Sequence, residues 1–236
     1  MKKKLVMLPA LMCDDRLYAH QIKTLEKFCD ISVFTFKDVD NTLEATKIIL
    51  EAIQEEIGNE HFHVIGTSMG GYIAMELMRH TKNIDSLCLI NTNYYEDSIE
   101  KKAQRFAQIE EAQDLLDSQF RAINKDVVNN YLYNSSYPKE SLLKDMAKNI
   151  GRLGFINQQK LILSRKSSVQ DFQYYDVPTL IVSGSMDSIT PPSLHEEMVE
   201  NLKKGTLVTI DNCGHLSPID QPEALSAVLE CWLKNV

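Results

Sequence analysis

The sequence predicts an α/β fold, built on a mostly parallel sheet of about six strands with helices on both faces. Short apolar runs recur along the 236 residues, and a helix-like stretch follows most of them. These runs are apolar throughout, whereas a strand with one solvated face alternates apolar and polar residues. Continuous apolar strands separated by helices are typical of a parallel sheet that is covered on both sides.

The expected elements follow one another in a regular order. The strands are expected at residues 5–8, 31–36, 62–67, 85–92, 178–184 and 206–211. The helices are expected at residues 18–28, 42–57, 69–80, 191–202 and 222–233. In the helix at 42–57, Leu43, Ile49 and Ile53 share one face, and Gly58 stands where a C-terminal cap belongs.

One long stretch, residues 94–171, interrupts this alternation. It contains no strand-like run, but several helical patterns. Pro138 suits the first turn of a helix that ends at Gly151, and a second helix is expected through "INQQKLILSR". We interpret 94–171 as a helical cap inserted into a core formed by residues 1–93 and 172–236. An ordinary run of connecting helices is the alternative, but the length of the stretch favours a cap.

Composition and charge exclude several classes of protein. A net charge of −8 leaves no basic footprint, so we expect no nucleic-acid partner and no anionic membrane partner. No run reaches the roughly 18 apolar residues of a membrane helix. The five cysteines are scattered, which favours a reduced, cytoplasmic protein over a disulfide framework or a metal site. The apolar run after Lys4 lacks a cleavage pattern, so we expect no signal peptide.

A candidate nucleophile lies in "GTSMGG", residues 66–71, where three of the nine glycines surround Ser68. Ser68 follows an expected strand and precedes an expected helix, so it lies at the carboxyl edge of the sheet, where ligands bind in α/β folds. A sharp strand-to-helix turn leaves no room for side chains at Gly66 and Gly70, and it holds the hydroxyl out above a helix N-terminus. G-x-S-x-G alone is only moderately specific, and a helix-capping serine is the alternative.

A nucleophilic serine needs a base, and His215 is the best placed of six histidines. It follows the last expected strand, and therefore lies at the same edge of the sheet as Ser68. Gly214 and Pro218 mark the loop that holds it. His20, His80 and His195 fall in helical stretches, and His61 and His63 lie at the opposite end of their strand. The alternative for His215 is an ordinary polar loop residue.

The base needs an orienting acid, for which we predict Asp187. It follows the expected strand at 178–184 and lies at the same edge. Asp211 is the main rival, but it precedes His215 so closely that its carboxylate would struggle to reach the ring. A helix-capping role is the alternative for Asp187.

The order Ser68, Asp187, His215, together with the helical insertion, resembles the α/β-hydrolase fold superfamily over nearly the whole chain. "SGSMDSITPP" resembles the acid loop of that family, and "CGHLSPIDQPEALSAVLECWL" resembles its histidine loop and final helix. In many members the first strand ends in His-Gly, whereas this chain has Leu8-Pro9-Ala10-Leu11-Met12. The resemblance implies an oxyanion hole formed by the N–H groups of Met69 and Leu11. The chain has no room for the extra hairpin of many members, so its sheet should be smaller.

These observations predict a serine hydrolase acting on a small carboxylic ester, thioester or lactone, with no metal or organic cofactor. Acyl transfer and carbon–carbon hydrolysis remain open on the same three residues, as does a non-catalytic ligand-binding member of the fold. Tyr94 and Tyr95 begin the cap and are candidates for substrate binding, with packing as the alternative. We expect a monomer or a weak homo-oligomer, with a small-molecule acyl substrate as partner.

Overall fold

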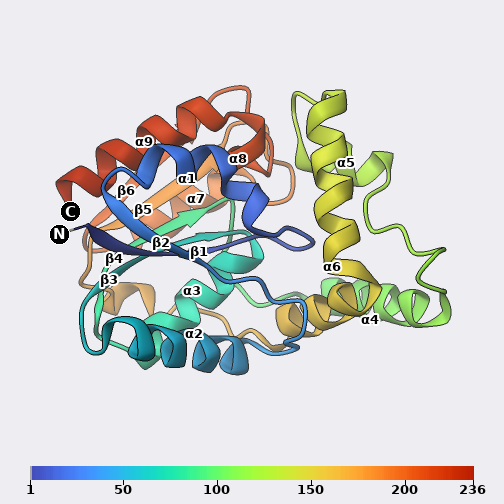
Figure 1. Ribbon diagram of the computed structural model, residues 1–236, viewed down its shortest axis with the longest axis horizontal. Helices are drawn as coiled ribbons and strands as arrows, with labels where there is room; N and C mark the ends of the chain where they lie inside the picture. The colour runs from blue at the N-terminus through green and yellow to red at the C-terminus, as the bar shows by residue number, and fades with distance from the viewer. Residues whose placement is uncertain (1) are drawn as a thin grey trace.

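The computed structural model of the protein describes residues 2–236 and confirms the predicted α/β fold (Figure 1). Six parallel strands form one sheet in the order β2-β1-β3-β4-β5-β6. The strands are β1 (Lys3–Leu8), β2 (Cys29–Val33), β3 (Phe62–Thr67), β4 (Ile84–Ile90), β5 (Thr179–Gly184) and β6 (Gly205–Ile210). After β2 the chain returns past β1 to form β3, so the loops that leave β1 and β3 diverge. This divergence opens a crevice at the carboxyl ends of the strands.

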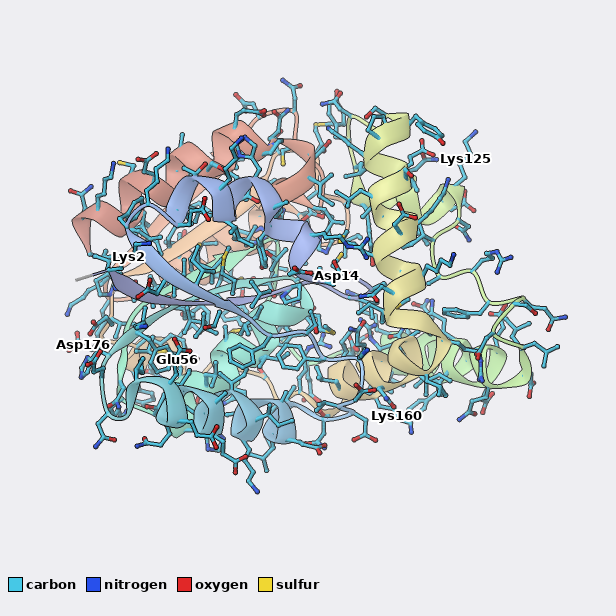
Figure 2. The ribbon with its side chains drawn as sticks, viewed as in Figure 1. Lys2, Asp14, Glu56, Lys125, Lys160 and Asp176 are labelled. Atoms are coloured by element: carbon cyan, nitrogen blue, oxygen red, sulfur yellow. The ribbon has the colours of Figure 1, made fainter. Side chains whose placement is uncertain are left out.

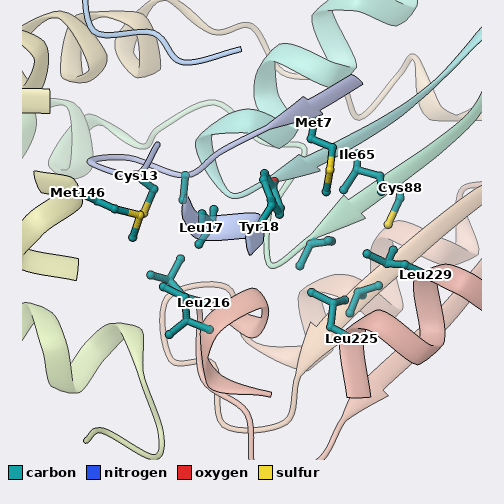
Figure 3. Close-up of a cluster of buried hydrophobic side chains, with 14 of the residues drawn as sticks. Met7, Cys13, Leu17, Tyr18, Ile65, Cys88, Met146, Leu216, Leu225 and Leu229 are labelled. Carbon is teal, nitrogen blue, oxygen red and sulfur yellow. The ribbon is translucent and has the colours of Figure 1, made fainter. Parts of the chain in front are cut away.

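Helices cover both faces of the sheet. One face carries α1 (Ala19–Leu25), which follows a 3-10 turn (Asp15–Tyr18), and α9 (Pro222–Asn235). The other face carries α2 (Thr42–Ile57), α3 (Met69–His80) and α7 (Pro192–Glu200). Figure 3 shows the first of the two apolar layers, in which the strand residues Met7 and Cys88 face Leu225 and Leu229 of α9.

The bounds of α2 and α3 agree with the prediction, but the buried face of α2 is rotated. Ile49 and Ile53 are buried as expected, whereas 57% of Leu43 is exposed. Thr42 and Ala45 are buried in its place. The buried side of α2 therefore uses smaller residues at these positions than the apolar pattern indicated.

Between β4 and β5 the chain forms α4 (Ile99–Asp114), α5 (Lys125–Tyr131) and α6 (Tyr137–Ser164), which lie together beside the core in Figure 1. The helix α6 contains both helices expected in this stretch. They meet at Gly151, whose backbone has φ 73° and ψ 179°, outside the helical region. A short 3-10 turn (Phe172–Tyr174) leads to β5, and a short helix, α8 (Ser217–Asp220), precedes α9.

The first half of α6 is attached to the loop that follows β1. Met146 belongs to the same apolar cluster as Cys13, and the two lie side by side in Figure 3. Asp14, labelled in Figure 2 at the junction of the core and α6, accepts a hydrogen bond of 2.9 Å from the Asn149 amide. The guanidinium of Arg16 also contacts this carboxylate, at 2.6 Å. The bond from Asn149 and the packing of Met146 on Cys13 hold α6 above the carboxyl edge of the sheet. Across residues 2–236, every helix is too short or too polar to cross a lipid bilayer.

Candidate active site

Ser68 occupies a sharp turn between β3 and α3. Its backbone has φ 51°, a left-handed conformation that is unusual for a residue with a side chain. The turn brings backbones into close contact, since a Cβ built on Gly70 would lie 2.0 Å from the carbonyl oxygen of Leu8. A Cβ on Gly66 would lie 2.5 Å from the carbonyl oxygen of Gly70. Close approach of backbone segments therefore explains both glycines, and strain of this kind is typical of functional sites.

His215 lies between the other two predicted residues. Its Nε2 is 2.9 Å from Ser68 Oγ, and its Nδ1 is 3.1 and 2.9 Å from the two carboxylate oxygens of Asp187. An ionised carboxylate can only accept hydrogen bonds, so Nδ1 carries the ring proton. Nε2 is then free to accept the hydroxyl hydrogen of Ser68. The structure thus brings together the three side chains that the sequence pattern selected.

The Asp187 carboxylate is buried among hydrogen-bond donors. Besides His215, it accepts bonds from Ile189 N at 2.9 Å, Thr190 N at 3.0 Å, Thr190 Oγ1 at 2.7 Å and Asn91 Nδ2 at 2.9 Å. Burial opposes ionisation, but the neighbouring His215 and the bonds from Thr190 outweigh it and lower the pKa of Asp187 below its ordinary value. This carboxylate is therefore an anion that holds the orientation of the ring.

The alternatives that the sequence left open lie elsewhere. Asp211 is exposed, and within residues 2–236 it makes no hydrogen bond to His215. His195 is buried under the site, where its Nε2 accepts a bond of 3.2 Å from the backbone N–H of Thr92. It does not contact Ser68, so its role is to hold the segment after β4.

Asn91 is a member of this site that sequence reasoning missed. It follows β4 with φ 45°, is fully buried, and donates from Nδ2 to Asp187. Its Oδ1 accepts the hydroxyl hydrogen of Ser217, which lies two residues after His215. Asn91 therefore links the loops that carry the acid and the histidine. Its position directly after an apolar strand, at the same edge as Ser68, is the signal that would have revealed it.

The two predicted oxyanion donors are both available. Among the described residues 2–236, neither Leu11 N nor Met69 N makes a hydrogen bond. The adjacent Met12 N–H donates instead to Gln158 Oε1, at 2.8 Å, and Met12 has φ 60°. Gln158 belongs to α6, so a side chain from the helical segment fixes the loop that carries Leu11. This second missed residue carried no signal in its own stretch of sequence.

A cavity of about 390 Å³ extends from Ser68 and His215 toward the helical segment. Leu11 and Tyr72 line it from the core, and most of the remaining wall belongs to residues 105–162. The wall combines apolar groups with several charged and amide side chains. A cavity of this size fits a small or medium ligand.

Tyr94 and Tyr95 do not line this cavity. The hydroxyl of Tyr94 donates to Glu197 of α7 at 2.7 Å, and the hydroxyl of Tyr95 donates to the same carboxylate. Tyr94 is buried against Phe172, with ring centroids 4.9 Å apart. The chain turns toward α7 after β4, so both tyrosine hydroxyls contact α7 and not the cavity beside Ser68.

Within residues 2–236, no three His, Cys, Asp or Glu side chains are grouped so as to hold a metal ion. The cysteines Cys13, Cys29, Cys88 and Cys213 are buried singly, and Cys231 is exposed.

Comparison with known proteins agrees with this geometry. A family model described as alpha/beta hydrolase fold matches residues 26–222. The monoacylglycerol lipase of Bos taurus is 22% identical over 237 residues, which cover 96% of this chain and 68% of the lipase. A pimeloyl-[acyl-carrier protein] methyl ester esterase of Neisseria meningitidis is 23% identical over 193 residues, covering 73% of this chain and 70% of the esterase.

A solved structure extends the comparison to three dimensions. A thermophilic esterase from Thermogutta terrifontis superposes with a TM-score of 0.87, covering 100% of this chain and 90% of the esterase, at 19% identity. At this identity the likeness concerns the fold. Since the family model spans most of the sequence, the chain belongs to the alpha/beta hydrolase fold family.

Proposed function

We propose that the protein is a serine hydrolase, which cleaves a small carboxylic ester, thioester or lactone through an acyl-enzyme on Ser68. The observation that carries this proposal is the unbroken chain of contacts from Ser68 Oγ through the His215 ring to Asp187, at the inner end of a cavity. A hydroxyl, a base and an orienting anion in this order are the arrangement for nucleophilic catalysis.

In the acylation step, the Ser68 hydroxyl proton passes to His215 Nε2 as Oγ attacks the carbonyl carbon of the substrate. The carbonyl π electrons move to oxygen, and the resulting oxyanion accepts hydrogen bonds from Leu11 N and Met69 N. When the tetrahedral intermediate collapses, the bond to the leaving group breaks, and the leaving group takes the proton from His215. Asp187 stabilises the imidazolium between these two transfers.

Deacylation repeats the sequence with water as the nucleophile. His215 takes a proton from water, the hydroxide oxygen attacks the acyl carbon, and the Ser68 oxygen leaves with that proton. Each oxyanion donor is worth about 3 kcal/mol of barrier in such reactions. The contact from Gln158 to the loop that carries Leu11 is therefore part of the proposed mechanism.

The helices between β4 and β5, within residues 94–171, form the cap of this proposed enzyme, and residues 105–162 of the cap supply most of its substrate-binding surface. The printed activities of the relatives, a monoacylglycerol lipase and a methyl ester esterase, support ester hydrolysis as the reaction. The esterase with the similar fold supports the same class. The cavity of about 390 Å³ favours a small or medium substrate.

A fluorophosphonate probe tests the nucleophile. We expect covalent labelling of the folded protein, which disappears in Ser68→Ala and falls sharply in His215→Ala. Ser136→Ala is the matched control, since Ser136 precedes α6 and its hydroxyl makes no capping bond. Labelling that persists in Ser68→Ala, or a folded protein that stays unlabelled, would contradict the proposal.

The substrate class is tested with p-nitrophenyl esters of increasing acyl length, run beside lactones and acyl thioesters. We expect the highest kcat/KM for short and medium acyl chains, since the cavity limits length. Product analysis with an added alcohol distinguishes hydrolysis from acyl transfer. A predominant transesterified product would replace hydrolysis with acyl transfer as the reaction.

A further inference from the structure

One wall of the cavity carries a guanidinium that is only partly used by the protein. Arg105, on α4, lines the same cavity as Ser68 and His215. Its Nε donates to Asp97 at 2.6 Å, and its Nη1 donates to Gln159 Oε1 at 2.6 Å. Among residues 2–236, no acceptor lies within hydrogen-bond distance of Nη2. The unused N–H groups of this fork therefore remain available to a ligand.

The charge around Arg105 is not balanced. Asp97 is buried and also binds the Arg165 guanidinium, at 2.7 Å from Nη2. Arg165 is held by the protein through all three of its nitrogens, because its Nε donates to Tyr95 O and its Nη1 to Ile162 O, beside the bond from Nη2 to Asp97. Two guanidinium cations thus share one carboxylate, which leaves one positive charge in excess beside the cavity. Burial opposes ionisation of Asp97, but the two arginines outweigh it and keep its pKa below the ordinary value.

The Arg105 guanidinium is also held in a fixed orientation. The amide of Gln159, which presents its oxygen to Arg105, donates from its nitrogen to Gln108 Oε1 at 2.8 Å. Both glutamines line the cavity. Only 20% of the Arg105 side chain is exposed, so water screens its charge less than at a free surface. The other charged residues of the wall, Glu111 and Arg121, are exposed and of opposite sign.

We propose that Arg105 is a specificity residue, which binds a carboxylate carried by the substrate at the end remote from the scissile carbonyl. The substrate class is then an ester, thioester or lactone that bears a free carboxylate, such as a monoester of a dicarboxylic acid. This inference rests on the proposed function for the reaction, but not for the binding. A guanidinium with three free N–H groups, two on Nη2 and one on Nη1, suits a carboxylate, because each carboxylate oxygen accepts a charge-assisted bond.

The kinetic test compares substrates that differ only in this charge. The acyl-side pair is p-nitrophenyl hydrogen adipate and its methyl-capped diester, and the alcohol-side pair is 4-acetoxybutanoate and 4-acetoxybutanamide. In at least one pair, we expect the carboxylate to have about 10-fold or higher kcat/KM than its neutral partner. Arg105→Gln should lower kcat/KM for that carboxylate by about 10- to 100-fold, and change the neutral substrate less than about 2-fold. Arg105→Lys should retain part of the preference.

The control variant is Arg152→Gln. Arg152 belongs to the same helical segment, is exposed to a similar degree, at 19%, and pairs with Asp117, but it does not line the cavity. Asp97 keeps Arg165 as its partner in Arg105→Gln, so the fold should persist, which a thermal unfolding curve checks. The proposal is overturned if neither pair shows the preference, or if Arg105→Gln lowers both members of a pair equally.

Calorimetric titration of monomethyl adipate into Ser68→Ala separates this proposal from the proposed function, since binding needs no turnover. We expect binding that is lost when Arg105→Gln is added to Ser68→Ala. If no ester is hydrolysed but this difference is seen, the carboxylate site stands and the hydrolase proposal fails. If esters are hydrolysed but the titration and the substrate pairs show no effect of Arg105, the carboxylate site fails alone.

Discussion

Replacing Asp187 with asparagine should disable the site by turning the histidine into the wrong tautomer. Asparagine keeps the shape of the side chain but converts one acceptor into an NH₂ donor. The position of Oδ1 faces the backbone N–H groups of Ile189 and Thr190, at 2.9 and 3.0 Å, and these donors cannot turn away. The position of Oδ2 faces the hydroxyl of Thr190, at 2.7 Å, which can rotate and accept. It also faces the Asn91 amide, at 2.9 Å, which can turn over to present its oxygen while Ser217 Oγ accepts from its nitrogen. The NH₂ group therefore takes the Oδ2 position.

That position is 2.9 Å from His215 Nδ1. An NH₂ group there donates to Nδ1, so the neutral ring carries its proton on Nε2, which faces Ser68 Oγ at 2.9 Å. A protonated Nε2 cannot accept the serine proton. The loss in kcat should be about 10⁴-fold, as for an amide replacing the acid of other serine triads, which corresponds to about 5 kcal/mol of barrier.

The assay is the rate of fluorophosphonate inactivation together with hydrolysis of p-nitrophenyl acetate, each measured for Asp187→Asn and for Asp211→Asn. Asp211 is exposed and outside this network, so its variant should stay within about 2-fold of the parent. Thermal unfolding checks that both variants fold. A loss below 10-fold in Asp187→Asn, or an equal loss in Asp211→Asn, would refute the tautomer argument.

Three other predictions concern the support of the site. Gln158→Ala leaves the Met12 N–H without its acceptor, so the free energy of unfolding should fall by about 1–3 kcal/mol in denaturant titration. The kcat should fall as well. An unchanged kcat would show that Gln158 does not position the oxyanion loop. Gly70→Ala forces a Cβ to within 2.0 Å of Leu8 O and should cost about 3 kcal/mol or more, whereas a melting temperature equal to that of the parent would show that the turn yields easily. Burial lowers the pKa of His195 from 6.5 to about 4, so the unfolded chain binds a proton first as the pH falls. The contribution of His195 to the free energy of unfolding should be full above pH 6.5 and should decrease toward pH 4 by at most about 3 kcal/mol. The decrease should be shallower in His195→Gln, as measured by urea unfolding at each pH. An equal decrease in the two proteins over this range would argue against this role of His195.

The sequence predicted well those elements whose boundaries are set by neighbouring residues in the chain. The bounds of α2 were correct, because the Asn41 side chain accepts a bond of 2.8 Å from Glu44 N at one end, and Gly58 adopts φ 63° at the other. Ser68, Asp187 and His215, which the structure brings into contact, were selected from the sequence for a related reason. Each follows an apolar strand, and a parallel sheet sends the carboxyl ends of its strands to one edge.

The residues that were missed depend on distant partners. Asn91 and its partner Asp187 are 96 positions apart, and Gln158 bonds to a backbone group 146 positions away. Periodicity within a helix does not report such contacts. The substrate role predicted for Tyr94 and Tyr95 depended on which way the chain turns when it leaves the sheet after β4. The sequence of a single strand does not specify that direction.

The break in α6 at Gly151 gives its two halves separate tasks. The half before it packs on the core through Met146, and the half after it reaches the cavity wall with Phe155 and Gln159. A Cβ at Gly151 would meet nothing within 4 Å, so only the backbone angle restricts this position. The second half of α6 is about 20 Å long at 1.5 Å per residue. A change in the backbone torsions of Gly151 would therefore redirect every side chain on this half of the helix. Because this half also carries Gln158, which fixes the loop of Leu11, the direction of the chain at Gly151 governs the cavity wall and the oxyanion loop together.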